Sequence, residues 1–456
     1  MADGKARGGS QGDGQDRPGE VGLWGAVAIG VGGMVGGGIF AVLGLAATLA
    51  GGGVPVAFLA GGLLALLTAY CYTRLSVAFP SAGGSVVFVN TAFGVDYFTG
   101  VVNNLLLIGY IVTLALYAYA FGHYAVTLLP GAWHSPLTVH LLISLAVVLP
   151  TLLNLAAASV ISRAETYIVG FKVAILLLVA VSGLFYVDPA RLSPAVWKPL
   201  PTIIGSGMVI FVAYEGFELI ANAAGGVRDA ARTLPRAYFT AVGFVTLLYV
   251  LIAVVTVGCL SPQTIAQAED YALAAAARPA LGAFGYRIVA VSAVLATLSA
   301  INATLYGAAR LSYVIATSGE LPEFLEDRVW NKPVVGLLIT AGLSLLLANL
   351  GGLSSISTMA SAGFLIIFAT VNAAAFVLAR RVGASRPLAA AGCLGCLAAF
   401  AVLLDHVAGT NPSHLWVLAG MAGLAMAVEG AYVLYLRKPE HKGKGRLHPP
   451  AGQTGG

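Results

Sequence analysis

The sequence predicts an all-α protein that crosses a membrane many times. Of its 456 residues, 59% are hydrophobic and 9% are charged, whereas an average soluble domain is about 25% charged. The mean hydropathy is +0.89, and the apolar residues gather in runs long enough for spanning helices of about 20 residues. Strands of a membrane barrel would be about ten residues of alternating polarity, a pattern that the sequence lacks. The fold class is therefore a polytopic helical membrane protein.

Twelve apolar runs define the expected spans, and two polar tails flank them. Residues 1–20 and 437–456 are rich in glycine and polar residues, and we expect both to be disordered tails. Residues 21–436 form the expected transmembrane domain. Its spans are expected at about 23–46, 54–79, 97–128, 137–156, 161–186, 202–223, 237–260, 280–316, 334–350, 355–380, 387–408 and 413–436.

The basic residues predict which side each loop faces. With the N-terminus placed inside, 19 of the 24 Lys and Arg residues fall in inner tails, loops or helix ends, and four fall outside. Cytoplasmic loops carry the excess of Lys and Arg in membrane proteins. We therefore expect an even number of spans and both termini in the cytoplasm. The expected location is the plasma membrane. The net charge of +5 is explained in this way, so the expected surroundings are the lipid bilayer and no nucleic acid is expected.

The first span contains a glycine cluster, GVGGMVGGGIF at Gly30–Phe40. Glycine costs about 1 kcal/mol relative to alanine inside a helix. Small residues four apart, such as Gly32 and Gly36, are typical of close helix packing, but three consecutive glycines exceed what packing needs. We interpret the cluster as unwound backbone, which is tolerated at membrane depth only where it lines a cavity enclosed by protein. Its free N–H groups suit a carboxylate.

The fifth span contains Lys172, the one basic residue expected at mid-membrane depth, in the sequence YIVGFKVAILLLVAVSGLF. A charge at the centre of a membrane helix costs about 2.5–3.5 kcal/mol on insertion scales. A leucine would avoid this cost. The lysine is therefore interpreted either as a group that pairs helices or as a proton-handling site.

The sixth span contains IFVAYEGFELIANAAGG, which places Glu215 and Glu218 near the membrane centre. This composition predicts a second interrupted helix, although one or both carboxylates could instead face water or pair with an arginine. Spans one and six are five spans apart. Two interrupted helices at corresponding positions of two halves indicate a midplane binding site in an inverted-repeat transporter.

The remaining polar residues indicate neither an enzyme nor a metalloprotein. Cys393 and Cys396 form a CxxC pair within an apolar run and are interpreted as packing residues. The histidines show no ligand pair at metal spacing. The sequence lacks a nucleophile–base pair and a P-loop, which argues against an enzyme and against an ATP-driven pump. No metal or cofactor is expected.

Five segments, in order along the chain, carry a family resemblance. They are VGGGIF (Val35–Phe40), FPSAGGSVVFV (Phe79–Val89), SRAETYIVGFK (Ser162–Lys172), FVAYEGFELIANAAGGVRDAARTLPRA (Phe211–Ala237) and SAINATLYGAARLSYVIATSGELPEFL (Ser299–Leu325). Together they resemble the amino acid–polyamine–organocation (APC) superfamily, and most closely its ApcT-type proton-coupled amino acid transporters. One departure is that Gly226 and Ala230 stand where the family often has an acidic residue and a proline after span six, so charge pairing at an inner gate is in question.

The resemblance implies a LeuT-like fold. Spans 1–5 (about 21–190) and 6–10 (about 200–380) would form two inverted repeats, and residues 387–436 would add two helices. The substrate carboxylate would bind N–H groups at the break in span one, and its ammonium would meet carbonyls freed at both breaks. Glu215 takes a position that is usually apolar in neutral amino acid carriers, so it would favour a cationic side chain or amine, or it would titrate. The implied substrate-binding residues are Met34, Gly36, Gly37, Gly38, Ile39, Phe211, Ala213, Tyr214 and Glu215.

The resemblance also implies a role for Lys172. In ApcT-like members a lysine of span five occupies the space of a sodium ion in sodium-coupled relatives, so the coupling ion would be a proton and no sodium is expected. Lys172 matches this motif by its distance from Arg163 and Glu165. Ser299 and a carbonyl near Gly32 are the implied partners of Lys172. Glu218 is a second, weaker candidate for proton coupling.

The sequence thus predicts a secondary active amino acid transporter, with proton-coupled uptake by alternating access. The alternative is an amino acid, amine or polyamine exchanger of the same fold, in which Lys172 stays charged as a fixed structural cation. A sensor or a subunit without transport activity is disfavoured, because the chain shows no added soluble domain. The sequence leaves the identity of the amino acid or amine and the oligomeric state open.

Overall fold

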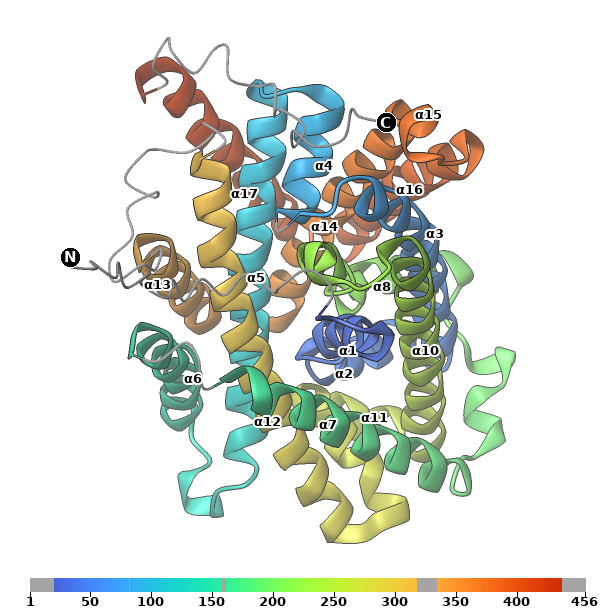
Figure 1. Cartoon of the computed structure of the whole chain (residues 1–456). Helices are drawn as coiled ribbons and strands as arrows, with labels where there is room; N and C mark the ends of the chain where they lie inside the picture. Colours follow the sequence, from blue (N-terminus) through green and yellow to red (C-terminus); the bar gives the residue numbers. More distant parts are fainter. Residues whose placement is uncertain (1–19, 82, 157–160, 318–333, 437–456) are drawn as a thin grey trace, which may run out of the picture.

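The computed structural model of the chain describes residues 20–81, 83–156, 161–317 and 334–436, and these residues form a bundle of helices (Figure 1). Within these ranges the only β-structure consists of two isolated bridges, Val21 with Val227 and Gly51 with Trp197. The predicted all-α class is therefore confirmed. In Figure 1, α1 (Leu23–Met34) and α2 (Gly38–Ala50) lie in the middle of the bundle.

In the described ranges, nine helices are long and apolar enough to cross a membrane. They are α3 (Val54–Ala78), α5 (Tyr97–Val126), α6 (Pro136–Ala156), α7 (Ile161–Leu184), α10 (Ala230–Cys259), α12 (Ala272–Thr317), α14 (Leu353–Val377), α16 (Arg386–Thr410) and α17 (Ser413–Ala431). Two bent pairs raise the number to eleven. The apolar helix α13 (Val334–Leu350) has 17 residues and coincides with the ninth expected span. The count of twelve stays a prediction.

Two spans are broken, as the sequence predicts. Helix α1 meets α2 at an angle of 45° across the turn Val35–Gly37. Helix α8 (Leu200–Val209) meets the segment Phe211–Asn222 at 55°. This segment consists of the 3-10 turn η4 (Phe211–Tyr214) and the short helix α9 (Leu219–Asn222). Between them Gly216 has a φ of +110°, a conformation that glycine adopts without the steric cost of a side chain.

One helix begins earlier than the hydropathy of the sequence predicts. Helix α10 begins at Ala230, whereas the apolar run begins at about 237. The first turns of α10 are polar and partly exposed, so they extend the helix beyond its apolar part. The range of α12 comprises two helices joined by a kink at Gly282, whose φ is +62°. The helix after this kink begins close to 280, where the eighth span is expected.

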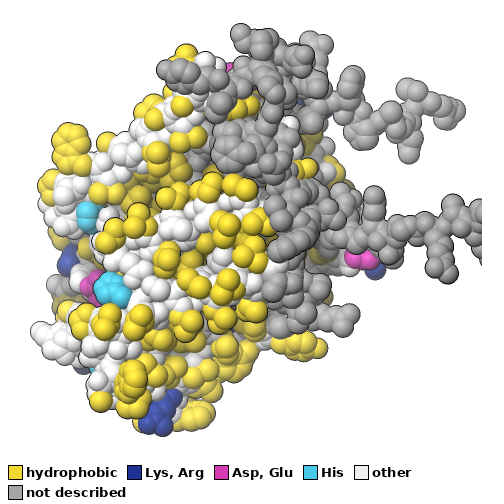
Figure 2. Space-filling model, turned by 90° about the vertical axis from the view of Figure 1, so that its left-hand side faces the viewer, with side chains coloured by type: hydrophobic (Ala, Val, Ile, Leu, Met, Phe, Trp, Pro, Cys, Tyr) yellow, Lys and Arg dark blue, Asp and Glu magenta, His cyan; other side chains and the backbone are white. Residues whose placement is uncertain are grey.

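The outer surface of the bundle is apolar. Leucines such as Leu141, Leu145 and Leu152 on α6 are exposed. Figure 2 shows hydrophobic side chains spread over the described part of one face, with few charged groups among them. Such a surface suits the hydrocarbon core of a bilayer. Buried polar groups lie inside the bundle, around the two breaks; they include Lys172, Glu215 and Glu218.

Candidate substrate and coupling site

A cavity of about 480 Å³ lies between α1, α5, α7, α12 and the break of the sixth span. This volume is within the range of about 300–1,000 Å³ that is typical of small-molecule sites. One end of the cavity is marked by Trp24, which is 75% exposed at the start of α1. The other end reaches Glu215 and Gly216, at the break inside the bundle. The cavity thus connects the surface to the middle of the protein.

Helix α5 presents a polar face to this cavity. Tyr110 and Tyr117 line it, and Thr113 donates a hydrogen bond of 2.7 Å from Oγ1 to Glu215 Oε2. These three residues are spaced by three and four, so they share one side of the helix. The spacing shows that the three side chains share a face, whereas the groups that this face meets depend on how α5 packs against its neighbours.

Glu215 is the acidic residue that lines the cavity. It follows the turn η4 in an extended conformation, is 4% exposed and lines the cavity. Among the described lining residues there is no Lys or Arg. The site therefore has acidic rather than basic character.

The two breaks touch each other through their backbones. A Cβ added at Gly33 would lie 2.7 Å from the carbonyl oxygen of Gly216, so only glycine allows this approach. Glu218, which is 2% exposed, accepts a hydrogen bond of 2.6 Å from the N–H of Gly216. The Glu218 carboxylate thus holds Gly216, the residue of the sixth span that contacts Gly33 of the first span.

Neighbouring helices satisfy the backbone groups that the breaks release. The hydroxyl of Tyr249 on α10 lies 2.7 Å from the carbonyl oxygen of Met34 and 3.2 Å from that of Ala213. On α14, Ser361 accepts from the N–H of Val212 at 2.9 Å and donates to the carbonyl of Val209 at 2.8 Å. Backbone at membrane depth needs such partners, because no lipid group replaces them.

Lys172 on α7 reaches the break of the first span. Its Nζ donates a hydrogen bond of 2.8 Å to the carbonyl oxygen of Gly32, and the residue is 1% exposed. This carbonyl is released because the last turn of α1 tightens, so that the N–H of Gly36 bonds to Gly33 instead. A Cβ at Gly32 would lie 2.9 Å from the side chain of Val169, so glycine also allows α7 to pack closely here.

The other residues that the resemblance implies for proton coupling lie around the same break. Ser299 on α12 lines the cavity. Glu218 is buried at the contact of the two breaks. The side chains of Arg163 and Glu165, which the family motif includes, lie outside the described residues, as do residues 318–325 of the fifth resembling segment.

Of the nine residues implied for substrate binding, Glu215 lines the cavity. Gly36, Gly37 and Gly38 pack against neighbours: a Cβ at Gly37 would overlap the ring of Tyr117, and one at Gly36 would lie 2.9 Å from Ala300 Cβ. Tyr117 thus packs against Gly37, just before the start of α2, and also lines the cavity.

Ile39, Phe211 and Tyr214 are fully buried. The hydroxyl of Tyr214 donates to the carbonyl of Phe58 at 2.6 Å, and the ring of Phe211 packs edge-on against Phe368. Sequence reasoning did not identify Tyr117 or Tyr249, because a tyrosine in an apolar helix carries no sign of which neighbour it will meet.

Comparison with known proteins agrees with this architecture. A family model described as amino acid permease matches residues 21–426. The chain is 33% identical to the uncharacterized protein MJ0609 of Methanocaldococcus jannaschii over 396 residues. This alignment covers 86% of this chain and 90% of that protein.

Two named transporters are also similar. The inner membrane transport protein YbaT of Escherichia coli is 36% identical over 386 residues, which is 84% of this chain and 89% of that protein. The branched-chain amino acid permease BcaP of Bacillus subtilis is 23% identical over 380 residues, which is 79% and 81% of the two chains. The chain therefore belongs to the amino acid permease family of the APC superfamily and is a membrane transporter rather than an enzyme.

Proposed function

We propose that the chain is a proton-coupled amino acid transporter of the plasma membrane that works by alternating access, with both termini in the cytoplasm and with neither sodium nor a cofactor in its cycle. The observation that carries the proposal is the hydrogen bond between Lys172 Nζ and the carbonyl of Gly32. A buried ammonium is favourable only when polar groups compensate it. A neutral amine would be a weaker partner for this carbonyl. Loss of the proton would therefore loosen α7 from the break of the first span.

A short route connects this bond to the cavity. Gly32 is followed by Gly33, which rests on Gly216. Gly216 is bonded to Glu218 and is preceded by Glu215. A movement of the first break relative to α7 would thus shift Gly216 and change the positions of Glu215 and Glu218. Such a two-state element, biased by one proton and by substrate, is what coupling requires.

The segment between α10 and α12 packs against α2, and we propose that it closes the face of the protein opposite to the cavity mouth. In this segment, η6 (Glu269–Tyr271) packs on α2, so closely that a Cβ at Gly44 would overlap the carbonyl oxygen of Glu269. His123 Nε2 at the end of α5 lies 3.5 Å from Asp270 Oδ2. With the termini in the cytoplasm, this arrangement corresponds to an inward-facing state.

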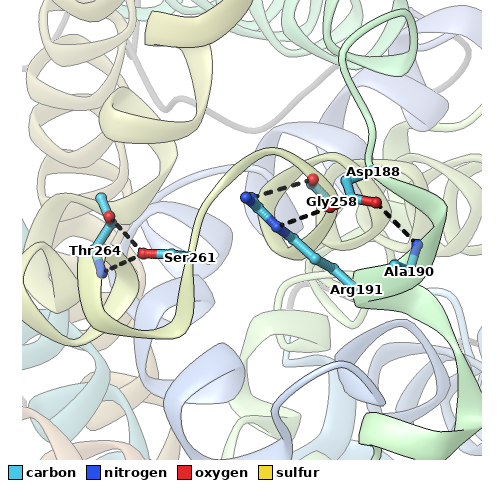
Figure 3. A network of polar contacts seen from close by, with 6 residues as sticks. All are labelled: Asp188, Ala190, Arg191, Gly258, Ser261 and Thr264. Atoms are coloured by element: carbon cyan, nitrogen blue, oxygen red, sulfur yellow. Dashed lines mark hydrogen bonds and ion pairs between the residues drawn. The ribbon is translucent and has the colours of Figure 1, made fainter.

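Hydrogen bonds stiffen the loops on this closed face. Figure 3 shows Arg191 directed at the carbonyl of Gly258, at the end of α10, while Asp188 accepts from the N–H of Ala190 at 3.0 Å. Ser261 accepts from the N–H of Thr264 at 3.2 Å at the start of α11 (Pro262–Gln267). These contacts hold the ends of the loops, so we propose that the segment moves as a unit when the outer side opens.

Gly44→Val is expected to shift the protein toward the outward-facing state. The new side chain would push η6 away from α2, and overpacking of this kind costs about 1–3 kcal/mol, or roughly five- to a hundredfold in an equilibrium. The measurement is thiol labelling of Ala303→Cys, at the cavity wall, in a background without the four native cysteines. Labelling by an impermeant reagent should fall from the cytoplasmic side and rise from outside.

Gly243→Val on α10 is the matched control, because no atom lies within 4 Å of its Cβ position. It should leave the labelling unchanged. Unaltered labelling in Gly44→Val would show that η6 does not close the outer side.

A second candidate function rests on the same hydrogen bond. If Lys172 keeps its proton throughout the cycle, it joins α7 to α1 as a fixed cation, and the protein is an exchanger of amino acids or amines. Uptake into sodium-free proteoliposomes separates the two functions. Accumulation of an amino acid driven by an inward proton gradient would support the proposal. Uptake that occurs only after a second substrate has been preloaded would instead support the exchanger.

A further inference from the structure

We infer that Glu215 selects substrates that carry a positively charged side group, either basic amino acids or the corresponding amines, by binding their ammonium or guanidinium group. The inference rests on the proposed transport function and specifies its substrate class. The carboxylate of Glu215 is inside the cavity and is oriented there by the hydroxyl of Thr113 on α5. Glu215, which lies between η4 and Gly216, is thus held in place by helix α5.

The charge balance of the cavity favours a cation. No Lys or Arg occurs among the described residues that line it. Glu218, a second buried acidic residue, lies three residues further along the same break. The Lys172 ammonium is directed to the carbonyl of Gly32 and is not among the lining groups. Opposite charges attract strongly where water is excluded, so a positively charged group would find its best position beside Glu215.

The neighbouring groups strengthen this preference. Met34 and Ala213, whose backbone oxygens lie within hydrogen-bond distance of the Tyr249 hydroxyl, are not among the residues that line the cavity. Glu215 is therefore the strongest acceptor that the cavity offers. The aromatic rings of Tyr110 and Tyr117 also line the cavity, and such rings attract ammonium and guanidinium groups across their faces.

Neutral and acidic amino acids fit this chemistry less well. Their carboxylate would approach the carboxyl group of Glu215, which lines the cavity, and the ring of Tyr117 packs against Gly37 just before the start of α2. The second positive charge of a basic amino acid would offset this repulsion between its carboxylate and the carboxyl group of Glu215. An amine without a carboxylate avoids the repulsion altogether.

Competition for uptake into proteoliposomes tests the inference. The competitors are lysine and arginine, the amines cadaverine and agmatine, and leucine and glutamate as neutral and acidic references. In the unmodified protein the basic compounds should compete best. Glu215→Gln should weaken them about ten- to a hundredfold, the effect expected for a lost charged hydrogen bond, and should change leucine by a smaller factor.

Two further variants separate an effect on substrate selectivity from an effect on folding. Glu215→Asp retains the charge and should retain the preference for basic compounds, which separates selectivity from folding. Thr113→Val removes the hydroxyl that positions the carboxylate and should reduce the preference without abolishing it. If lysine and arginine compete but cadaverine and agmatine do not, the substrate is a basic amino acid. The reverse result identifies an amine.

Equal competition by leucine and lysine in the unmodified protein would overturn the inference, as would a uniform loss of all classes in Glu215→Gln. Neither result would affect the proposed transport function. The proposed transport function is contradicted by a different result, namely that none of these compounds accumulates in the proteoliposomes when an inward proton gradient is applied.

Discussion

Substituting alanine for Lys172 is expected to abolish proton-driven accumulation of substrate while part of the exchange activity remains. The substitution removes both the titratable amine and its hydrogen bond to Gly32. Substrate would still reach the cavity, because Lys172 is not among the lining residues. The measurement is the ratio of internal to external labelled substrate in sodium-free proteoliposomes with an inward proton gradient. The ratio should fall to the value found without a gradient.

Lys172→Arg is the informative partner of this variant. Arginine keeps the positive charge but stays protonated in proteins. If Lys172 releases a proton in each cycle, the arginine variant should fail to accumulate substrate, as the alanine variant does. If Lys172 is a fixed cation, arginine should restore much of the activity. Concentrative uptake by the alanine variant would remove Lys172 from the coupling mechanism.

Adding one methyl group at Gly33 is expected to impair substrate binding and proton coupling together. A Cβ there would lie 2.7 Å from the carbonyl oxygen of Gly216 and 2.9 Å from its Cα. Because these are backbone atoms, the two breaks would have to separate. Overpacking of this kind costs about 1–3 kcal/mol. We expect Gly33→Ala to weaken substrate binding at least about tenfold and to uncouple uptake from the proton gradient.

Gly243→Ala is the matched control for Gly33→Ala. Gly243 lies on α10 and does not line the cavity, and no atom lies within 4 Å of its Cβ position. Alanine also suits a helix better than glycine does, so this variant should bind and accumulate substrate normally. Binding by the purified variants is measured by titration calorimetry, and accumulation in proteoliposomes. Equal behaviour of the two variants would show that the contact between the breaks is not part of the coupling.

The sequence carries enough information to predict the class of fold and both broken spans. Helix length and hydropathy indicate spans because the bilayer sets the required length. Three consecutive glycines, and a glycine between two acidic residues, are locally unfavourable in a membrane helix, so both breaks could be expected from composition. In the same way, a buried lysine within the fifth span requires a polar partner, and the carbonyl oxygen of Gly32 accepts its hydrogen bond.

The contacts between helices could not be predicted in this way. Tyr117 covers Gly37, and Tyr249 lies within hydrogen-bond distance of carbonyls from both breaks, because of how α5 and α10 rotate against their neighbours. Such rotations depend on packing across the whole bundle. For the same reason Glu215 could be recognised as unusual, whereas its hydroxyl partner Thr113 on α5 required the structure.

Proton movement driven by substrate is the most direct test of the central claim. Sodium-free proteoliposomes would contain a trapped pH indicator, with the membrane potential clamped by potassium and valinomycin and without an initial pH gradient. Adding a transported substrate outside should acidify the interior, and Lys172→Ala should abolish the acidification. Influx of labelled substrate without acidification in the unmodified protein would contradict proton coupling and leave Lys172 as a fixed cation.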